Sequence, residues 1–256
     1  MYAFGPGLTP GISTSVNILD LIFPKRCVGC GRIGTYFCPR CISTIKIIET
    51  AICPVCEKPG IDGATHPGCK TRYALDGFTS FFRYDGVVRK AIKAIKYRSV
   101  FDLAQAFVDL VPSVFFSQLS TMNRQPFILV PIPLHPSRFR ERGFNQAEAM
   151  GHIVAKRLHV PVVTDILRRV KKSTPQVEMK SKDARLKNMD GVFAVNADAM
   201  KHRPARNASS IADAGGRIDA ILLFDDVFTT GATMRAAANV LKRAGAPFVW
   251  GVTMAR

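Results

Sequence analysis

The seven cysteines of the chain occur in regularly spaced pairs near its N-terminal end. Each pair has two intervening residues, and a histidine replaces one cysteine; the pairs are Cys27/Cys30, Cys38/Cys41, Cys53/Cys56 and His66/Cys69. This spacing lets a tight turn aim two ligands at one tetrahedral zinc ion, and thiolates favour zinc or an iron–sulfur cluster over magnesium. The alternatives are disulfides or buried free thiols.

The spacing predicts a zinc site at the first quartet, Cys27, Cys30, Cys38 and Cys41. The second quartet has a wider central gap and contains the histidine; its members are Cys53, Cys56, His66 and Cys69. A second zinc ion and a group without metal both remain open there. Sequential pairing gives these two quartets, and cross-brace pairing, in which alternate ligand pairs share an ion, stays open.

The stretch ILLFDDVFTTGAT, residues 221–233, has a different chemistry. Its apolar run predicts a buried strand that ends at two adjacent carboxylates, Asp225 and Asp226. A loop of small and hydroxyl-bearing residues follows before a predicted helix; its residues are Thr229, Thr230, Gly231, Ala232 and Thr233. Backbone N–H groups at a helix N-terminus can hold a phosphate, and two carboxylates can accept hydrogen bonds from a vicinal diol. The pattern therefore indicates a sugar phosphate with two free ribose hydroxyls.

Two alternatives fit this stretch less well. A Walker B strand also ends in acids, but it needs a Gly-Lys phosphate-binding motif, and the chain contains no Gly-Lys dipeptide. A solvated turn around the two acids leaves the TTGAT loop unexplained. The stretch is therefore interpreted as an anion-binding loop.

The elements that must position these residues follow from periodicity. Strands are predicted at 78–84, 127–133, 191–195, 220–226 and 247–255, and helices at 86–99, 102–116, 143–160 and 233–245. This alternation predicts an α/β fold with a mostly parallel sheet, preceded by a small Cys-rich, zinc-ribbon-like module. The expected division is an N-terminal segment with a short helix, a zinc-binding module, and an α/β domain with a flexible insertion; the respective ranges are 1–26, 27–72, 73–256 and 196–219.

The formal net charge of +17 over 256 residues favours a polyanionic partner, such as a nucleotide, a nucleic acid or an acidic membrane surface. No apolar run approaches the roughly 18 residues of a membrane helix, and the first residues lack the pattern of a secretory signal. We therefore expect a cytoplasmic protein without a membrane span, in which disulfides are unfavourable.

The 13 residues of ILLFDDVFTTGAT resemble the phosphoribosyl pyrophosphate (PRPP) loop of type I phosphoribosyltransferases. More of the chain resembles the ComF family of competence proteins, from about Leu19 to the C-terminal end. The resemblance rests on the Cys-rich segment and on the residues at 91–99, 130–150 and 174–195, with RGFNQ at 142–146 as its most telling element. Two departures are His66, where the family usually has cysteine, and the length of the 196–219 insertion.

The resemblance implies roles for individual residues. Asp225 and Asp226 would hold the ribose hydroxyls, and the loop 229–233 would hold the 5-phosphate. Pyrophosphate would lie beyond strand 127–133 with Arg142 and Lys96 as counter-charges, although Arg142 also fits a plain surface arginine. Mg²⁺ would bridge pyrophosphate and ribose oxygens. The basic stretch 167–187 would be a mobile hood or a solvated loop, and no catalytic residue is identified.

Three functions follow from the resemblance. The protein would bind PRPP and handle single-stranded DNA during DNA uptake and natural transformation, with a DNA-uptake helicase or other competence proteins as partners. The alternatives are a phosphoribosyltransferase acting on an unidentified base and a regulator that senses PRPP without turnover. Basic segments at 89–98, 138–142 and 168–187 favour the DNA-handling function. The aromatic residues near them either stack on bases or, for most of them, belong to the core; they are Phe81, Phe82, Tyr84, Tyr97 and Phe139.

Overall fold

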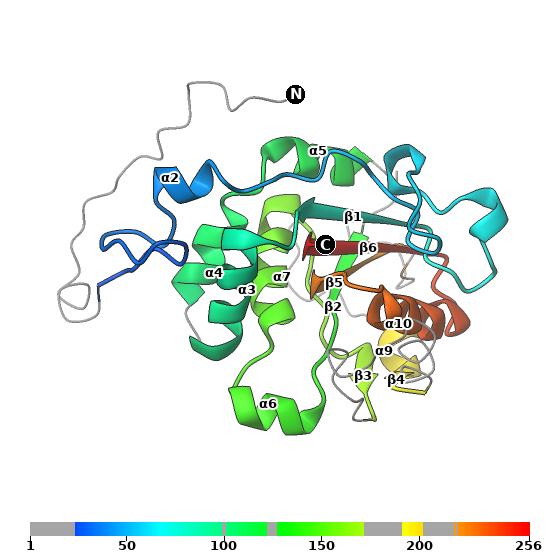
Figure 1. Cartoon of the computed structure of the whole chain (residues 1–256). Coiled ribbons are helices and arrows are strands. Elements are labelled where there is room, and N and C mark those ends of the chain that lie inside the picture. Colours follow the sequence, from blue (N-terminus) through cyan, green and yellow to red (C-terminus); the bar gives the residue numbers. More distant parts are fainter. Residues whose placement is uncertain (1–23, 99–100, 122–126, 172–190, 202–217, 219) are drawn as a thin grey trace.

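The computed structural model describes most of the α/β region and the Cys-rich segment (Figure 1); the described residues are 24–98, 101–121, 127–171, 191–201, 218 and 220–256. The short helix predicted before residue 27 lies outside this part of the chain, as does most of the predicted hood. Within the described ranges, no helix is both long and apolar enough to cross a membrane.

A four-stranded parallel sheet forms the centre of the structure. Its order is β1–β6–β5–β2, with β1 at Gly77–Phe82, β6 at Phe248–Ala255, β5 at Ala220–Val227 and β2 at Phe127–Pro131. Every residue of β2 is buried, as its continuous apolar run predicts. The predicted α/β class with a mostly parallel sheet is confirmed.

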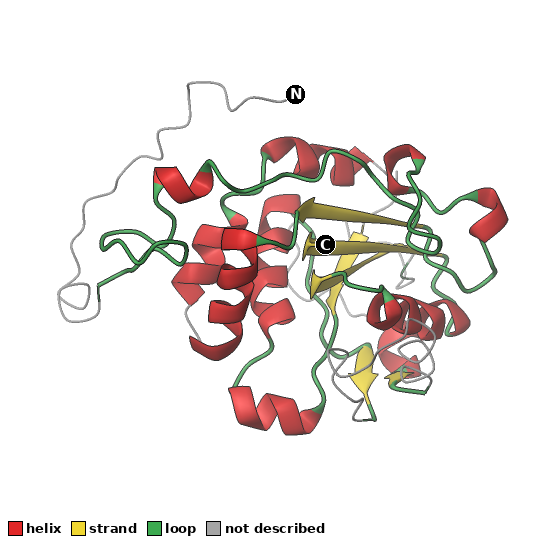
Figure 2. Cartoon of the chain, in the orientation of Figure 1, coloured by secondary structure: helices red, strands yellow, loops and turns green. Residues whose placement is uncertain are grey.

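Helices cover both faces of this sheet (Figure 2). Alternation along β5 sends Leu222 and Phe224 to one face and Ile221 and Leu223 to the other. The first face packs against α3 (Gly86–Arg98), α4 (Phe101–Val108), α5 (Ser113–Thr121) and α7 (Gln146–Leu158). The second face packs against α10 (Ala232–Arg243). Two apolar cores therefore lie on opposite sides of one sheet.

Two helix predictions were incomplete. The predicted helix at 102–116 is two helices, α4 and α5, separated around Pro112. Proline lacks a backbone N–H and disfavours the helical conformation of the residue before it, so the chain turns there. Helix α6 (Pro136–Arg142) was missed; His135 caps its first turn by accepting from Ser137 N, and Gly143 ends it at a φ of 77°.

The strand predicted at 191–195 forms at Phe193–Val195 as β4, but it does not join the main sheet. It pairs in antiparallel fashion with β3 (Leu167–Arg169). The predicted flexible insertion was wrong at its start, because helix α9 occupies Ala197–Lys201. The Asn196 side chain accepts from Ala199 N at 3.5 Å, and Met200 packs against the α10-side core. The remainder, 202–217 and 219, lies outside the described residues.

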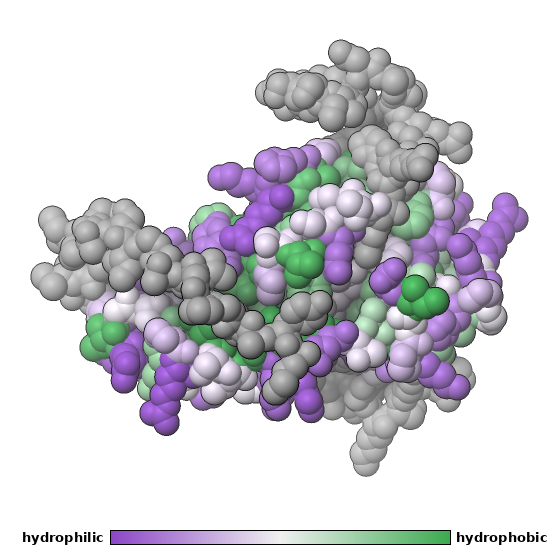
Figure 3. All heavy atoms as spheres, turned by 90° about the horizontal axis from the view of Figure 1, so that it is seen from above, coloured by the Kyte–Doolittle hydropathy of each residue, from purple (hydrophilic) through white to green (hydrophobic). Residues whose placement is uncertain are grey.

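The Cys-rich segment runs along the exposed edge of β1. It contains α2 (Pro39–Ile42) and the short 3₁₀ turns η1 (Ile61–Gly63) and η2 (Pro67–Cys69). Ile48 N donates to Phe81 O at 2.9 Å, and isolated bridges join Ile47 to Phe82 and Ala64 to Gly77. The segment thus covers an edge that would otherwise expose unpaired backbone groups. Seen from above, this side carries many hydrophilic side chains with smaller apolar areas between them (Figure 3).

Candidate metal centres and anion-binding loop

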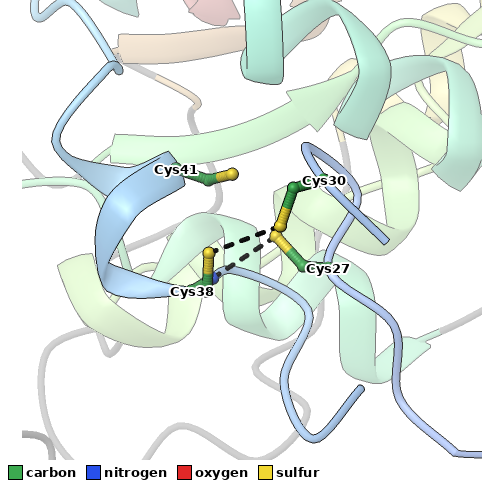
Figure 4. A group of neighbouring side chains, drawn as sticks. All are labelled: Cys27, Cys30, Cys38 and Cys41. Atoms are coloured by element: carbon green, nitrogen blue, oxygen red, sulfur yellow. Dashed lines mark hydrogen bonds between the residues drawn. The ribbon is translucent and has the colours of Figure 1, made fainter. Parts of the chain in front are cut away.

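The first cysteine quartet converges on one point (Figure 4). The sulfur atoms of Cys27, Cys30, Cys38 and Cys41 all lie within 4.8 Å of one another. Cys38 precedes α2 and Cys41 lies in it, while a turn carries the other two. Gly29 allows this turn to approach closely, since a Cβ there would lie 2.5 Å from Cys41 Sγ. The two pairs are therefore combined sequentially, not as a cross-brace.

The pKa values of two of these thiols are shifted in opposite directions. Burial raises the pKa of Cys27, but backbone N–H groups, first that of Cys38, outweigh burial and lower it to about 6. Burial and then the neighbouring thiols raise the pKa of Cys41 to about 12. Four thiolates at this separation repel one another unless a cation lies between them. A divalent, thiophilic ion satisfies that requirement.

The second quartet converges in the same way. The ligand atoms of Cys53, Cys56, His66 and Cys69 lie within 4.8 Å of one another. His66 Nδ1 is 3.3 Å from Cys56 Sγ, and its Nε2 is 2.9 Å from Pro59 O. When Nε2–H donates to this carbonyl, Nδ1 keeps its lone pair for a metal, which is a common arrangement for metal-binding histidines. The histidine is therefore placed as a ligand.

Both quartets fit tetrahedral zinc in donor type, number and convergence. The first offers four thiols, and the second offers three thiols and one imidazole. Neither contains the oxygen donors that magnesium or calcium prefers. These features support structural zinc in the Cys-rich segment.

The loop predicted to bind an anion, called the anion-binding loop below, follows β5. Asp225 and Asp226 come near the end of β5, and their carboxyl groups are close enough to interact. Asp225 lines a small pocket together with residues of the following loop, among them Thr229, Gly231 and Thr233. Burial, followed by repulsion from Asp226, raises the pKa of Asp225.

Asp226 instead faces α3, where its Oδ2 is 2.6 Å from Lys96 Nζ. Burial lowers the pKa of Lys96, but attraction to this carboxylate outweighs burial and raises it. The structure thus brings Lys96 to the end of β5, with Asp226 as its partner. A contact between Lys96 and pyrophosphate stays a prediction.

Gly231 determines the shape of the loop. It caps α10 at a φ of 67°, which an L side chain rarely adopts. A Cβ there would lie 2.6 Å from Cε2 of Phe228 and 3.0 Å from Arg235 Nη1. The hydroxyl of Thr230 is buried without a hydrogen-bond partner among the described residues. The loop is therefore a narrow, donor-bearing turn at the start of a helix, as expected for an anion cradle.

The RGFNQ element at 142–146 has a clear structural role. Asn145 caps α7 by accepting from Ala147 N at 3.2 Å, and its Nδ2 donates to Ile132 O just after β2. Arg142 Nη1 donates to Gln146 Oε1 at 3.0 Å. The element therefore fixes the segment that leaves β2. The proposed phosphate contact of Arg142 stays a prediction.

Three basic residues near the loop were not predicted as site residues. Burial and then Arg138 lower the pKa of Arg169, whereas Asp225 raises it, so Arg169 is close enough to interact with each of them. Arg235 donates from Nη2 to Thr230 O at 2.6 Å. Arg138 and Arg169 lie within basic segments visible in the sequence, but only the fold brings Arg169 near Asp225.

Comparisons with known proteins agree with this architecture. Residues 18–70 match the model of the double zinc ribbon domain. The chain is 29% identical to the competence protein ComFC of Bacillus subtilis, over 81% of this chain and 78% of the relative. It is 23% identical to competence protein F of Haemophilus influenzae, over 85% and 96% of the two chains. Competence protein ComFC of Streptococcus pneumoniae is 26% identical, over 88% of this chain and 83% of its own.

The fold and the two ligand groups define a double zinc ribbon followed by a parallel α/β domain. Together with the similarity to three competence proteins, they support assignment of the chain to the ComF family.

Proposed function

We propose that this ComF family protein acts in competence and DNA uptake by binding a phosphorylated ribose, such as PRPP, at its β5–α10 loop. The competence proteins to which it is similar support the broader role. The observation that carries the ribose proposal is the loop itself. It combines a pocket carboxylate, a glycine without room for a side chain and a helix N-terminus.

Each part of the loop has a task in this proposal. The N–H groups at the start of α10 and the threonine hydroxyls hold the 5-phosphate. Asp225 accepts a hydrogen bond from a ribose hydroxyl, and Asp226 does so while it holds Lys96 at the same strand end. Lys96 then offers positive charge to pyrophosphate. Mg²⁺, when bound, would neutralise charge on the substrate oxygens.

We further propose that single-stranded DNA lies on the α6–β3 surface, defined as Arg138, Phe139, Arg140, Arg168 and Arg169. Phe139 is 47% exposed between two arginines, although a phenylalanine usually packs in a core. An exposed ring can stack on a base while neighbouring guanidinium groups hold the backbone phosphates. The interaction of Arg169 with both Arg138 and Asp225 supports a surface continuous with the ribose site.

Binding measurements at two salt concentrations test the ribose proposal and the DNA proposal. PRPP is titrated by calorimetry, and a single-stranded oligonucleotide and its duplex are titrated by fluorescence anisotropy. Each single-strand phosphate contact contributes about −0.7 to the log–log salt slope. Phe139→Ala should reduce the preference for the single strand, whereas Phe101→Ala, which removes another exposed ring (61%), should not.

Equal affinity for single strand and duplex would contradict the DNA proposal and leave the ribose proposal standing. Release of pyrophosphate from PRPP in the presence of nucleobases would favour a transferase instead. PRPP binding without turnover and without a single-strand preference would favour a sensor.

A further inference from the structure

Arg235 joins two parts of the molecule that are distant in sequence. Its Nη1 donates to Pro54 O at 2.8 Å, and its Nη2 donates to Thr230 O at 2.6 Å. Pro54 lies inside the Cys53–Cys56 turn, so it is flanked by ligands of the second quartet. Thr230 directly precedes Gly231, the cap of α10. One side chain therefore bridges a metal-ligand turn and the anion-binding loop.

The bridge is sterically confined. The position that a Cβ of Gly231 would take lies 3.0 Å from Arg235 Nη1 and 2.6 Å from Cε2 of Phe228. Phe228 is buried and packs on Phe78 at a centroid distance of 4.2 Å. The loop is thus held between a fixed aromatic ring and the guanidinium. A shift of the guanidinium would change the direction of the loop backbone.

The second ligand turn can itself be held by metal. Cys53 N donates to Lys58 O at 3.0 Å and Glu57 N donates to Cys53 O at 2.9 Å, which closes the turn around Pro54. Metal coordination by two cysteines of this turn would fix its peptide planes, including the Pro54 carbonyl. A planar guanidinium can hold two carbonyl groups at a fixed angle, which a lysine ammonium cannot do in the same way.

We propose that Arg235 is a positioning residue through which metal at the second quartet orders the anion-binding loop. With zinc bound, the Pro54 carbonyl anchors Nη1, and Nη2 holds the Thr230 carbonyl so that the loop N–H groups converge. Loss of zinc releases the anchor and loosens the loop. The effect on ligand affinity rests on the proposed function, whereas the effect on loop order does not.

The first quartet provides a matched comparison. Its Cys27–Cys30 turn is tied to α3, because Lys90 Nζ donates to Gly29 O at 2.8 Å. Val87 of the same helix packs against its cysteines. The first metal site therefore braces α3, whereas the second braces the loop.

Hydrogen–deuterium exchange of the zinc-loaded full chain tests the proposal. We expect Cys69→Ser and Arg235→Lys each to speed amide exchange in 229–235 by at least fivefold. Cys30→Ser, which removes a ligand of the first quartet, should leave this segment unchanged. The Cys69→Ser/Arg235→Lys double variant should exchange no faster than Arg235→Lys alone, because both changes break one linkage. Metal analysis of each cysteine variant measures whether one zinc ion is lost. If Cys69→Ser keeps both zinc ions, Cys53→Ser is used in its place.

The proposal is overturned if loss of the second zinc leaves exchange in the loop unchanged, or if the two changes add. A second experiment measures PRPP binding by calorimetry. Arg235→Lys should retain its zinc and bind PRPP at least fivefold more weakly than the wild type. Arg243→Lys, on the same helix and in contact with Asn239 and Tyr73, is the control. Wild-type protein that fails to bind PRPP would refute the proposed function alone, because amide exchange is measured without ligand.

Discussion

Gly231→Ala should destabilise the protein and weaken ligand binding beyond what its backbone conformation alone explains. At a φ of 67°, an L side chain costs about 1–2 kcal/mol. The added Cβ also lies 2.6 Å from Cε2 of Phe228, whose ring is buried against Phe78 and cannot move without disturbing the core. Overpacking of this kind costs about 1–3 kcal/mol. We therefore expect a total loss of about 2–5 kcal/mol in the free energy of unfolding.

Gly245→Ala separates the two contributions. Gly245 follows the same helix at a φ of 99°, and a Cβ there meets no atom within 4 Å. Its cost should be limited to the conformational part, about 1–2 kcal/mol. Urea unfolding of both variants gives the difference, and PRPP calorimetry should show at least a tenfold loss for Gly231→Ala only. Equal stabilities and equal affinities for the two variants would refute the steric description of the loop.

Three further predictions concern the metal sites and the acids. Cys30→Ser and Cys69→Ser should each lower the zinc content of the purified protein from two ions to one, as metal analysis would show; an unchanged content in both would contradict the assigned ligands. The raised pKa of Asp225 means that the folded protein holds this proton more tightly than the unfolded chain, so its contribution to stability should fall as pH rises from about 4 toward the raised pKa. Asp225→Asn should remove that part of the pH dependence in urea titrations, and an identical profile for the variant would count against the shift. Lys96→Met leaves the buried Asp226 carboxylate without its ion-pair partner and should cost about 3–5 kcal/mol in the free energy of unfolding. Lys70→Met, which removes a 59% exposed partner of Asp76 at 3.5 Å, should cost less than about 1 kcal/mol in the same urea unfolding assay. Equal costs would show that burial of the ion pair does not matter.

The sequence was most informative where one local rule determined the structure. The apolar run before Asp225 predicted a buried parallel strand, and the residues after it predicted a helix that begins beside a small loop. The ligand spacing predicted all eight ligand residues, whereas the exclusion of a cross-brace between the ligand pairs required the folded chain. Strong hydrophobic periodicity and short ligand spacings can be recognised directly in the sequence.

The missed features depend on long-range packing or on a single interruption. Pro112 splits a helix whose apolar pattern is otherwise continuous, and β4 pairs with β3 because the fold, not its composition, supplies the partner. Arg235 gave no signal in an amphipathic helix, since its partner Pro54 is 181 residues away. The ion pair of Asp226 with Lys96 depends on the packing of α3 beside the end of β5, which the sequence interpretation of the two acids did not include.

The most direct test of the central claim is a calorimetric titration of the zinc-loaded full chain with PRPP and Mg²⁺. We predict saturable binding at one site, weakened at least tenfold by the isosteric change Asp225→Asn, because a charged hydrogen bond of about 1.5–3 kcal/mol is lost. Gly245→Ala, at the far end of α10, should bind as the wild type does. Absence of binding, or equal affinity in folded Asp225→Asn, would contradict the assignment of the β5–α10 loop as a phosphorylated-ribose site.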